Sequence, residues 1–83
     1  MIKENWRKSV IALRIKYLRE NGKNGKISQE TLAIKAGIPM VTLAKIEQGK
    51  ITKPAFQTVW KIVNALGYTL DEFTQEMNIN SFN

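Results

Sequence analysis

Apolar residues recur at three- and four-residue steps among Arg and Lys near the start of the chain, which is the period of an amphipathic helix. No Pro or Gly interrupts this pattern between Asn5 and Asn21, and its apolar members are Trp6, Val10, Ile11, Ile15 and Leu18. The Asn-Gly-Lys-Asn-Gly run at 21–25 favours positive φ and helix C-terminal caps. The pattern therefore predicts a long helix that ends near Gly22, followed by a short connection.

A second apolar stripe follows Ser28. Ser is a favoured helix N-cap, and Glu30 supplies an acid in the first turn, where the helix dipole favours negative charge. Thr31 stands where a capping box has Glu or Gln, so only half of that motif is present. The helix is predicted to end at Gly37. Its buried stripe is predicted to hold Leu32, Ala33 and Ala36.

A third helix is predicted after a very short connection. Pro39 suits a first helical turn, and Gly49 is expected to end the helix. Leu43 and Ile46 fall at inward-facing positions between them. Because only residues 37–39 separate the second and third helices, the two must pack at a steep angle, as in a helix-turn-helix.

Two further helices follow the basic loop 50–54. The fourth is predicted to end at Gly67, with a core face of Phe56, Val59, Ile62, Val63 and Leu66. The fifth is predicted from Thr69, with Asp71 and Glu72 in its first turn and Leu70 and Phe73 directed inward. The fold class is therefore all-α, with five helices in one domain over residues 1–77, and residues 78–83 are expected to form a frayed tail.

The composition offers little for catalysis. A chain of 83 residues forms one small domain, and it contains neither Cys nor His, so disulfides, the usual metal sites and Ser-His-Asp or Cys-His arrangements are excluded. Asp71 and Glu72 are adjacent, but neighbours on a helix point in different directions, so we interpret them as a solvated helix start. We expect no enzyme activity, no metal and no cofactor.

Charge is distributed unevenly along the chain. Residues 1–53 hold twelve Lys and Arg against four acids, whereas residues 54–83 hold one against three. Such asymmetry suggests a polyanionic partner, although lysines that serve only solubility give the same pattern. No apolar run approaches the roughly 20 residues needed to cross a bilayer, and the first residues lack the features of a signal peptide. We expect a cytoplasmic protein.

Several spaced elements resemble the helix-turn-helix of phage repressor and Cro-like (XRE-type) regulators. They are Ser-Gln and Leu-Ala in the second helix, Gly-Ile at the turn, Thr-Leu and Ile-Glu-x-Gly in the third, and Ala-Leu-Gly-x-x-Leu-Asp-Glu-Phe near the end. The similarity covers about residues 11–75. It implies a lambda-repressor-like fold that binds double-stranded DNA with its third helix in the major groove.

The resemblance also implies which residues face DNA. The base-facing set is Pro39, Met40, Val41, Thr42 and Lys45. The phosphate-binding set is Ser28, Gln29, Gln48, Lys50 and Lys53. Arg19 and Glu47 match a pair that joins the first helix to the end of the third as an internal ion pair, and we interpret them as structural.

This chain departs from the family pattern in three places. Met40 and Val41 stand where the family often carries Arg, Gln or Ser, and they can read only thymine methyls or shape, or else form a protein-binding or partly buried face. Pro39 replaces the usual Ser or Thr cap. The connection 21–26 is about three residues longer than is common, and we favour a flexible loop over extra phosphate contacts from Lys23 and Lys26.

The sequence thus indicates a sequence-specific DNA-binding transcriptional regulator, and we expect a repressor rather than an activator. An antitoxin with a toxin as partner, a restriction-modification controller, or a protein-interaction module with weak DNA binding would look similar. Since operators of such proteins are two-fold symmetric, we expect a homodimer. Its candidate contact residues are Trp60, for which core burial is the alternative, and Tyr68, Ile79 and Phe82.

Overall fold

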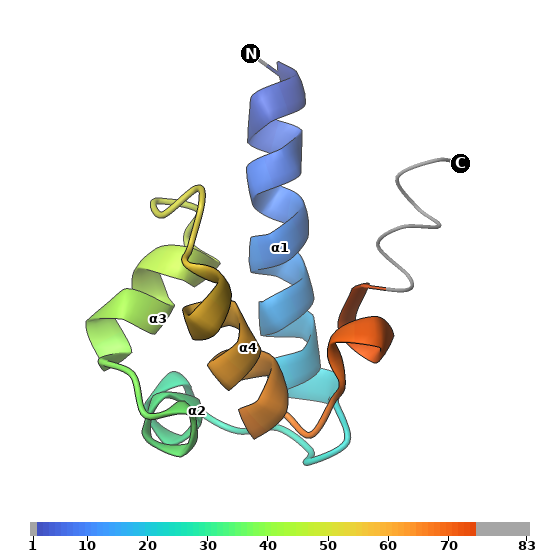
Figure 1. Ribbon diagram of the computed structural model, residues 1–83, viewed down its shortest axis with the longest axis vertical. Coiled ribbons are helices and arrows are strands. Elements are labelled where there is room, and N and C mark those ends of the chain that lie inside the picture. The colour runs from blue at the N-terminus through green and yellow to red at the C-terminus, as the bar shows by residue number, and fades with distance from the viewer. Residues whose placement is uncertain (1, 75–83) are drawn as a thin grey trace.

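The computed structural model describes the backbone of residues 2–74 and the side chains of residues 10–74. The chain forms helices α1 (Ile2–Asn21), α2 (Gln29–Ala36), α3 (Met40–Glu47) and α4 (Phe56–Ala65), and residues 70–74 are also helical (Figure 1). Over the described range there is no strand, only a single bridge between Gly22 and Gly25. The predicted all-α fold with five helices is confirmed.

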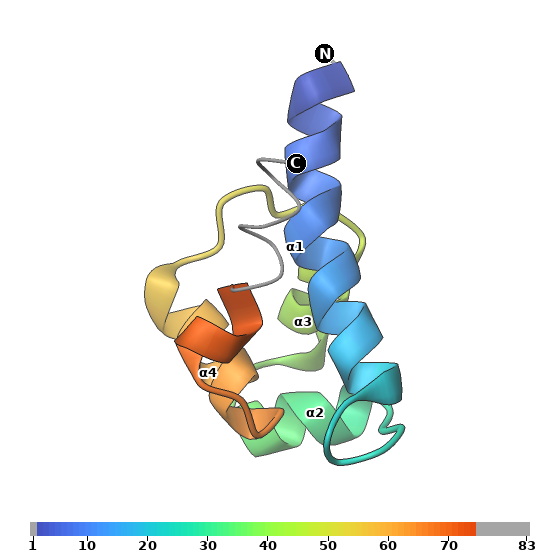
Figure 2. The ribbon, with the colours of Figure 1, turned by 90° about the vertical axis from the view of Figure 1, so that its right-hand side faces the viewer.

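The first helix is longer than predicted at its start. α1 begins at Ile2 rather than Asn5 and ends at Asn21. The turn that follows requires glycine at position 22, because a Cβ there would collide with the carbonyl oxygen of Leu18. The N-terminal part of α1 projects beyond the other helices in both ribbon views (Figures 1 and 2).

The caps of α2 follow the prediction closely. Ser28 Oγ accepts a hydrogen bond from the backbone N–H of Thr31 at 3.0 Å, as an N-cap side chain does. Gly37 adopts the left-handed conformation, with φ of 71°, and ends the helix. Thr31 contributes to the cap through its hydroxyl, which accepts from Ser28 Oγ at 3.0 Å.

The connection from α2 to α3 is as short as the sequence suggested. Pro39 occupies the N-cap position of α3, just outside the helix, in extended conformation and with no side-chain cap. The two helices cross steeply, since Figure 1 shows α2 nearly end-on while α3 lies across the view. This steep pair is the helix-turn-helix.

One apolar core joins all the helices. The buried cluster consists of Ile15, Leu18, Leu32, Ala33, Ala36, Leu43, Ile46, Ile62, Val63, Leu66 and Phe73. All of these positions were predicted to be inward-facing from the apolar pattern of the sequence. Each helix of the helix-turn-helix therefore has its inner face fixed and its outer face presented to solvent.

Phe56 was wrongly assigned to the core. Its side chain is 68% exposed, whereas Ile62, Val63 and Leu66 are buried and Val59 is half-buried. Phe56 is the first residue of α4, and at 100° per residue it is rotated away from the centre of the buried stripe toward Trp60. Phe56 and Trp60 thus share an outer face.

The last described helical segment has a complete capping box. Thr69 Oγ1 accepts from the backbone N–H of Glu72 at 3.1 Å, and Glu72 Oε1 accepts from the N–H of Thr69 at 3.0 Å. Phe73, one residue later, is buried in the core, as predicted. The predicted domain end at 77, the tail 78–83 and the dimer candidates Ile79 and Phe82 lie outside the described residues.

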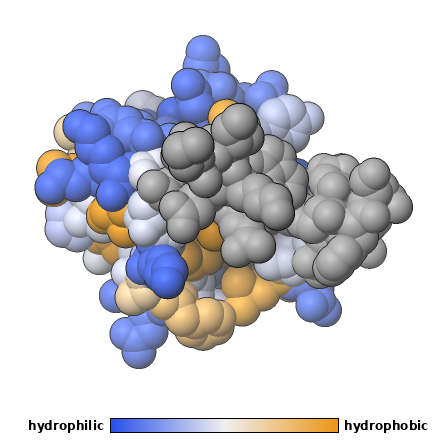
Figure 3. All heavy atoms as spheres, turned by 90° about the horizontal axis from the view of Figure 1, so that it is seen from above, coloured by the Kyte–Doolittle hydropathy of each residue, from blue (hydrophilic) through white to orange (hydrophobic). Residues whose placement is uncertain are grey.

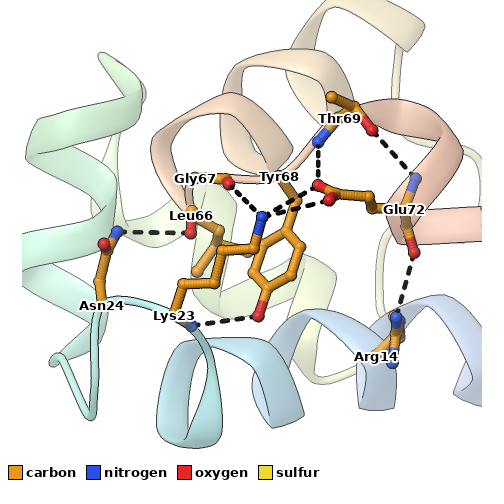
Figure 4. Close-up of polar contacts among 8 residues, drawn as sticks. All are labelled: Arg14, Lys23, Asn24, Leu66, Gly67, Tyr68, Thr69 and Glu72. Carbon is orange, nitrogen blue, oxygen red and sulfur yellow. Dashed lines mark hydrogen bonds and ion pairs between the residues drawn. The ribbon is translucent and has the colours of Figure 1, made fainter.

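The connection after α1 is held in place rather than loose, contrary to the interpretation we favoured. Asn24 Nδ2 donates to the carbonyls of Ala65 and Leu66 at the end of α4, at 3.4 and 3.3 Å. The backbone N–H of Lys23 donates to the hydroxyl of Tyr68 at 3.1 Å (Figure 4). The extra length allows the connection to reach across and cap α4.

Candidate nucleic-acid interface

α3 presents a mixed apolar and cationic face to solvent. Its buried residues are Leu43 and Ile46, and the opposite positions Met40 and Val41 are 51% and 58% exposed. Lys45 is exposed one turn after Val41. Of the five predicted base-facing residues, Pro39, Met40, Val41 and Lys45 are exposed and Thr42 is half-buried. The set therefore lies on the outer face of α3, with Thr42 at its edge.

The loop after α3 is basic and anchored at its base. Gly49, with φ of 79°, allows the chain to turn, and the N–H groups of Lys50 and Ile51 donate to the carbonyl of Lys45 at 2.9 and 3.3 Å. Ile51 packs against the core. The predicted phosphate contacts Gln48, Lys50 and Lys53 are exposed around this anchor. On the side of the molecule where α3 and this loop lie, the left in Figure 3, hydrophilic atoms surround smaller apolar areas.

The start of α2 supplies the other two predicted phosphate contacts. Ser28 is exposed, but its hydroxyl already serves as the N-cap. Gln29 is half-buried, and its amide donates to Glu47 Oε1 at 2.9 Å. Because an amide nitrogen carries two hydrogens, Gln29 keeps one donor beyond this bond. Both residues thus have an internal partner: the cap bond of Ser28 was predicted, whereas the bond of Gln29 to Glu47 was not.

Arg19 and Glu47 meet in a bidentate ion pair beneath the helix-turn-helix. Arg19 Nε donates to Glu47 Oε2 at 2.8 Å and its Nη2 donates to Oε1 at 3.0 Å. Both side chains are largely buried. Arg19 Nη1 also donates to the carbonyl of Ile27 at 2.9 Å. The hydrogen bonds to Glu47 raise the pKa of Arg19 above its ordinary value, so the guanidinium remains charged.

This cluster connects three elements of the site. Arg19 comes from the last turn of α1, Gln29 opens α2 and Glu47 closes α3. The carboxylate of Glu47 accepts from both of the others. It therefore fixes the start of α2 relative to the end of α3, the two places from which the predicted phosphate contacts project. Gln29 was the member that sequence reasoning missed, and only its position after an N-cap Ser hinted at it.

The ammonium group of Lys23 makes polar contacts within the protein. Its Nζ donates to both carboxylate oxygens of Glu72 at 3.2 Å and to the carbonyl of Gly67 at 3.3 Å (Figure 4). It also lies 4.6 Å from the centre of the Tyr68 ring. The N–H of Thr69, and then Lys23, hold the pKa of Glu72 below its ordinary value. Lys26 is exposed, as Lys23 is.

Among the described residues, two exposed aromatic side chains lie on α4, and a third, Tyr17, lies on α1. Phe56 and Trp60, one turn apart, are 68% and 48% exposed, so the core position considered for Trp60 is wrong. Tyr68 is half-buried, and its hydroxyl accepts from Lys23 within the same chain. As a surface for another molecule, the Phe56–Trp60 stripe is therefore better exposed than Tyr68.

The fold and this interface define a DNA-binding regulator whose second and third helices form a helix-turn-helix. The sequence model of the helix-turn-helix family matches residues 15–73, from the core of α1 to the buried Phe73, and the chain belongs to that family, of the XRE type. Among curated proteins, none matches the chain. Members of this family are DNA-binding regulatory domains.

The described residues include no group of three or more acidic, His or Cys side chains placed to hold a metal ion. No helix in the described part of the chain has the length and apolar character to cross a membrane. Over the same residues, every buried side-chain nitrogen or oxygen has a hydrogen-bond partner.

Proposed function

We propose that this protein is a sequence-specific transcriptional repressor that inserts α3 into the major groove of double-stranded DNA. The observation that carries the proposal is the outer face of α3, where Met40, Val41 and Lys45 are exposed while Leu43 and Ile46 hold the helix to the core. A helix whose opposite face is fixed in this way can enter the groove as a rigid body.

The phosphate backbone is held from both ends of the helix-turn-helix. Lys50 and Lys53 supply cations from the loop after α3, and Gln48 supplies an amide beside them. At the start of α2, the remaining amide hydrogen of Gln29 donates to a phosphate oxygen, and the helix dipole favours the same anion. Ser28, the exposed N-cap residue of α2, lies next to this phosphate position.

The DNA-bound form is a homodimer on a two-fold symmetric operator. The stripe of Phe56 and Trp60 on α4 supports this part of the proposal, because two large aromatic side chains exposed one turn apart offer a continuous apolar surface that a second subunit can cover. A symmetric dimer uses the same patch on both subunits. Two α3 helices are then placed about 34 Å apart, one turn of DNA.

Repression follows from occupancy of the operator in the cytoplasm, with no catalytic step and no cofactor. Within the described residues the only chemistry presented to solvent on the α3 face is apolar contact, hydrogen bonding and positive charge. A protein partner on the same face is the competing possibility, favoured by the exposure of Met40 and Val41.

Selection from a random DNA pool, followed by sequencing, tests the proposal at about 150 mM salt, where non-specific phosphate binding is weakened. We expect a palindromic motif to be enriched. Lys45→Ala is expected to alter the preferred base at one position, whereas Lys50→Ala weakens binding to all sequences alike. Absence of any enriched motif, with weak and salt-sensitive binding only, would reject DNA-sequence recognition and favour a protein partner.

A further inference from the structure

The beginning of α3 carries an apolar surface that phosphate binding does not explain. Pro39, Met40 and Val41 are consecutive and exposed, and Pro39 offers no side-chain cap to the helix. Met40 and Val41 expose 51% and 58% of their surface. Since the loop after α3 and the start of α2 are polar, the apolar turn lies within an otherwise hydrophilic face.

The major groove contains one apolar group that matches such a surface. Guanine, adenine and cytosine present hydrogen-bond donors and acceptors at their major-groove edges, whereas thymine also presents its C5-methyl group. An apolar side chain packed on a polar base edge displaces water without replacing its hydrogen bonds, which is unfavourable. Packed on a methyl group, the same side chain gains the free energy of burying apolar surface.

We propose that Met40 and Val41 read thymine methyl groups, so that each operator half-site carries A·T base pairs opposite the first turn of α3. The inference rests on the proposed function and specifies the DNA sequence class that this site selects. It assigns base discrimination to apolar contacts of these two residues, in place of side-chain hydrogen bonds at the same positions.

Lys45 sets the position of the next base read. It follows Val41 by four residues on the same face of α3, a rise of about 6 Å along the helix. With base pairs stacked at about 3.4 Å, this distance corresponds to roughly two base-pair steps. Lys45 can donate to the O6 and N7 acceptors of guanine. The half-site therefore combines thymine with a guanine about two steps away.

Uracil substitution tests the methyl contact directly. In the operator obtained by selection, each thymine of a half-site is replaced in turn by deoxyuridine, which keeps base pairing and removes only the C5-methyl group. We expect affinity to fall about fourfold at the contacted thymines, the effect of losing one buried methyl group, and to stay unchanged at the others. At the same positions, 5-methylcytosine is expected to bind more tightly than cytosine, because the two bases differ only in the C5-methyl group.

Protein variants assign the effect to its residues. Val41→Ala and Met40→Ala are expected to reduce the ratio of thymine to uracil affinity toward one, each at its own base position. Both side chains are exposed, so folding should be retained. Ile34→Ala is the matched control, since Ile34 is an apolar side chain 73% exposed on α2, and it should leave the ratio unchanged.

The two proposals fail in different ways. If a palindromic operator is selected but no uracil substitution changes its affinity, or if Val41→Ala and Met40→Ala leave the thymine preference intact, the methyl-reading inference is wrong and the DNA-binding function stands. If no operator is selected at all, the proposed function is rejected, and this inference with it.

Discussion

Glu47 is the residue on which the geometry of the helix-turn-helix depends most. It accepts hydrogen bonds from Arg19 and Gln29. Its side chain and that of Arg19 are largely buried. A buried ion pair contributes little net stability compared with an apolar pair, but removing one member leaves an unpaired buried charge. Glu47 is therefore important because its removal would leave the buried guanidinium of Arg19 without this carboxylate partner.

Glu47→Ala is expected to destabilise the domain by roughly 3–5 kcal/mol. Arg19 would keep its bond to the carbonyl of Ile27 and its longer ion pair with Glu20, at 3.8 Å, and Gln29 would lose its partner. For a domain of this size the loss corresponds to a fall in Tm of more than about 10 °C, measured by circular dichroism. Glu30→Ala, at an exposed Glu of α2, is the control and should shift Tm far less. Similar Tm values for the two variants would contradict a structural role for the pair.

Glu72 makes the stability of the last described helix depend on pH. Its pKa is lowered from the ordinary value of 4.5, first by the N–H of Thr69 and then by Lys23. A group whose pKa is lower in the folded state stabilises the fold above its unfolded pKa, and this contribution disappears as pH falls through the folded pKa. The carboxylate therefore stabilises the domain at neutral pH and ceases to do so in acid.

We expect Glu72→Gln to be less stable than the wild type at pH 7 and to approach it in acid, as pH falls below the ordinary pKa of 4.5 and through the lowered pKa of Glu72 in the folded protein. Urea unfolding at a series of pH values measures the difference. Asp71→Asn, at the exposed neighbour, is the matched control and should give a smaller difference. A gap between Glu72→Gln and wild type that stays constant from pH 7 to pH 3 would show that the charge of Glu72 is not involved.

At the scale of elements, helix bounds and buried stripes were predictable because they depend on local rules. Ser28 and Gly37 bound α2 as their cap preferences require, and Leu43 and Ile46 are buried at helical spacing. The exposure of Phe56 and the contacts of Lys23 depend instead on neighbours distant in sequence. Periodicity alone does not say how far the core extends along α4, nor that Lys23 meets Glu72. The candidate site followed from the resemblance, whereas the bond of Gln29 to Glu47 required the structure.

Tyr68→Phe tests whether the connection 22–26 is fixed by its contact with the C-terminal part of the domain. The substitution removes the acceptor for the N–H of Lys23, and we expect a loss of about 1 kcal/mol. The amide of Lys23 should also exchange with solvent faster, as measured by NMR. Tyr17→Phe removes a hydroxyl from an exposed Tyr on α1 and should change neither quantity. Unchanged exchange at Lys23 in Tyr68→Phe would argue that the hydroxyl does not hold the connection.

At the scale of the whole molecule, the two proposed surfaces belong to different helices. The surface proposed to contact DNA is the outer face of α3, and the outer face of α4 carries the exposed aromatic pair Phe56 and Trp60. This separation lets the dimer contact and the DNA contact be changed independently. Variants of α4 should alter oligomeric state while leaving the groove-facing residues unchanged.

Phe56→Ser is expected to convert a dimer into a monomer without loss of fold, because Phe56 is 68% exposed in the single chain. Sedimentation should give twice the 9.5 kDa chain mass for the wild type and the chain mass for the variant. Binding to a full palindromic operator should weaken, while binding to an isolated half-site stays the same. Leu13→Ser, at a residue 63% exposed on α1, is the control and should remain dimeric. A wild type that is monomeric at high micromolar concentration, with and without operator, would remove the dimer from the proposal.

The basic loop after α3 can be distinguished from the base-facing residues by the salt dependence of DNA affinity. Cations on phosphates and side chains on base edges contribute differently to that dependence. Lys50 and Lys53 are exposed on this loop, and each phosphate contact releases about one counterion from DNA. Lys50→Ala and Lys53→Ala should therefore each lower the slope of log affinity against log salt by about 1 for every chain that binds. Lys61→Ala, at an exposed lysine of α4, should leave the slope unchanged. If removing Lys50 and Lys53 alters the preferred sequence but not the slope, these lysines contact bases rather than the backbone, and the division between the two predicted sets is wrong.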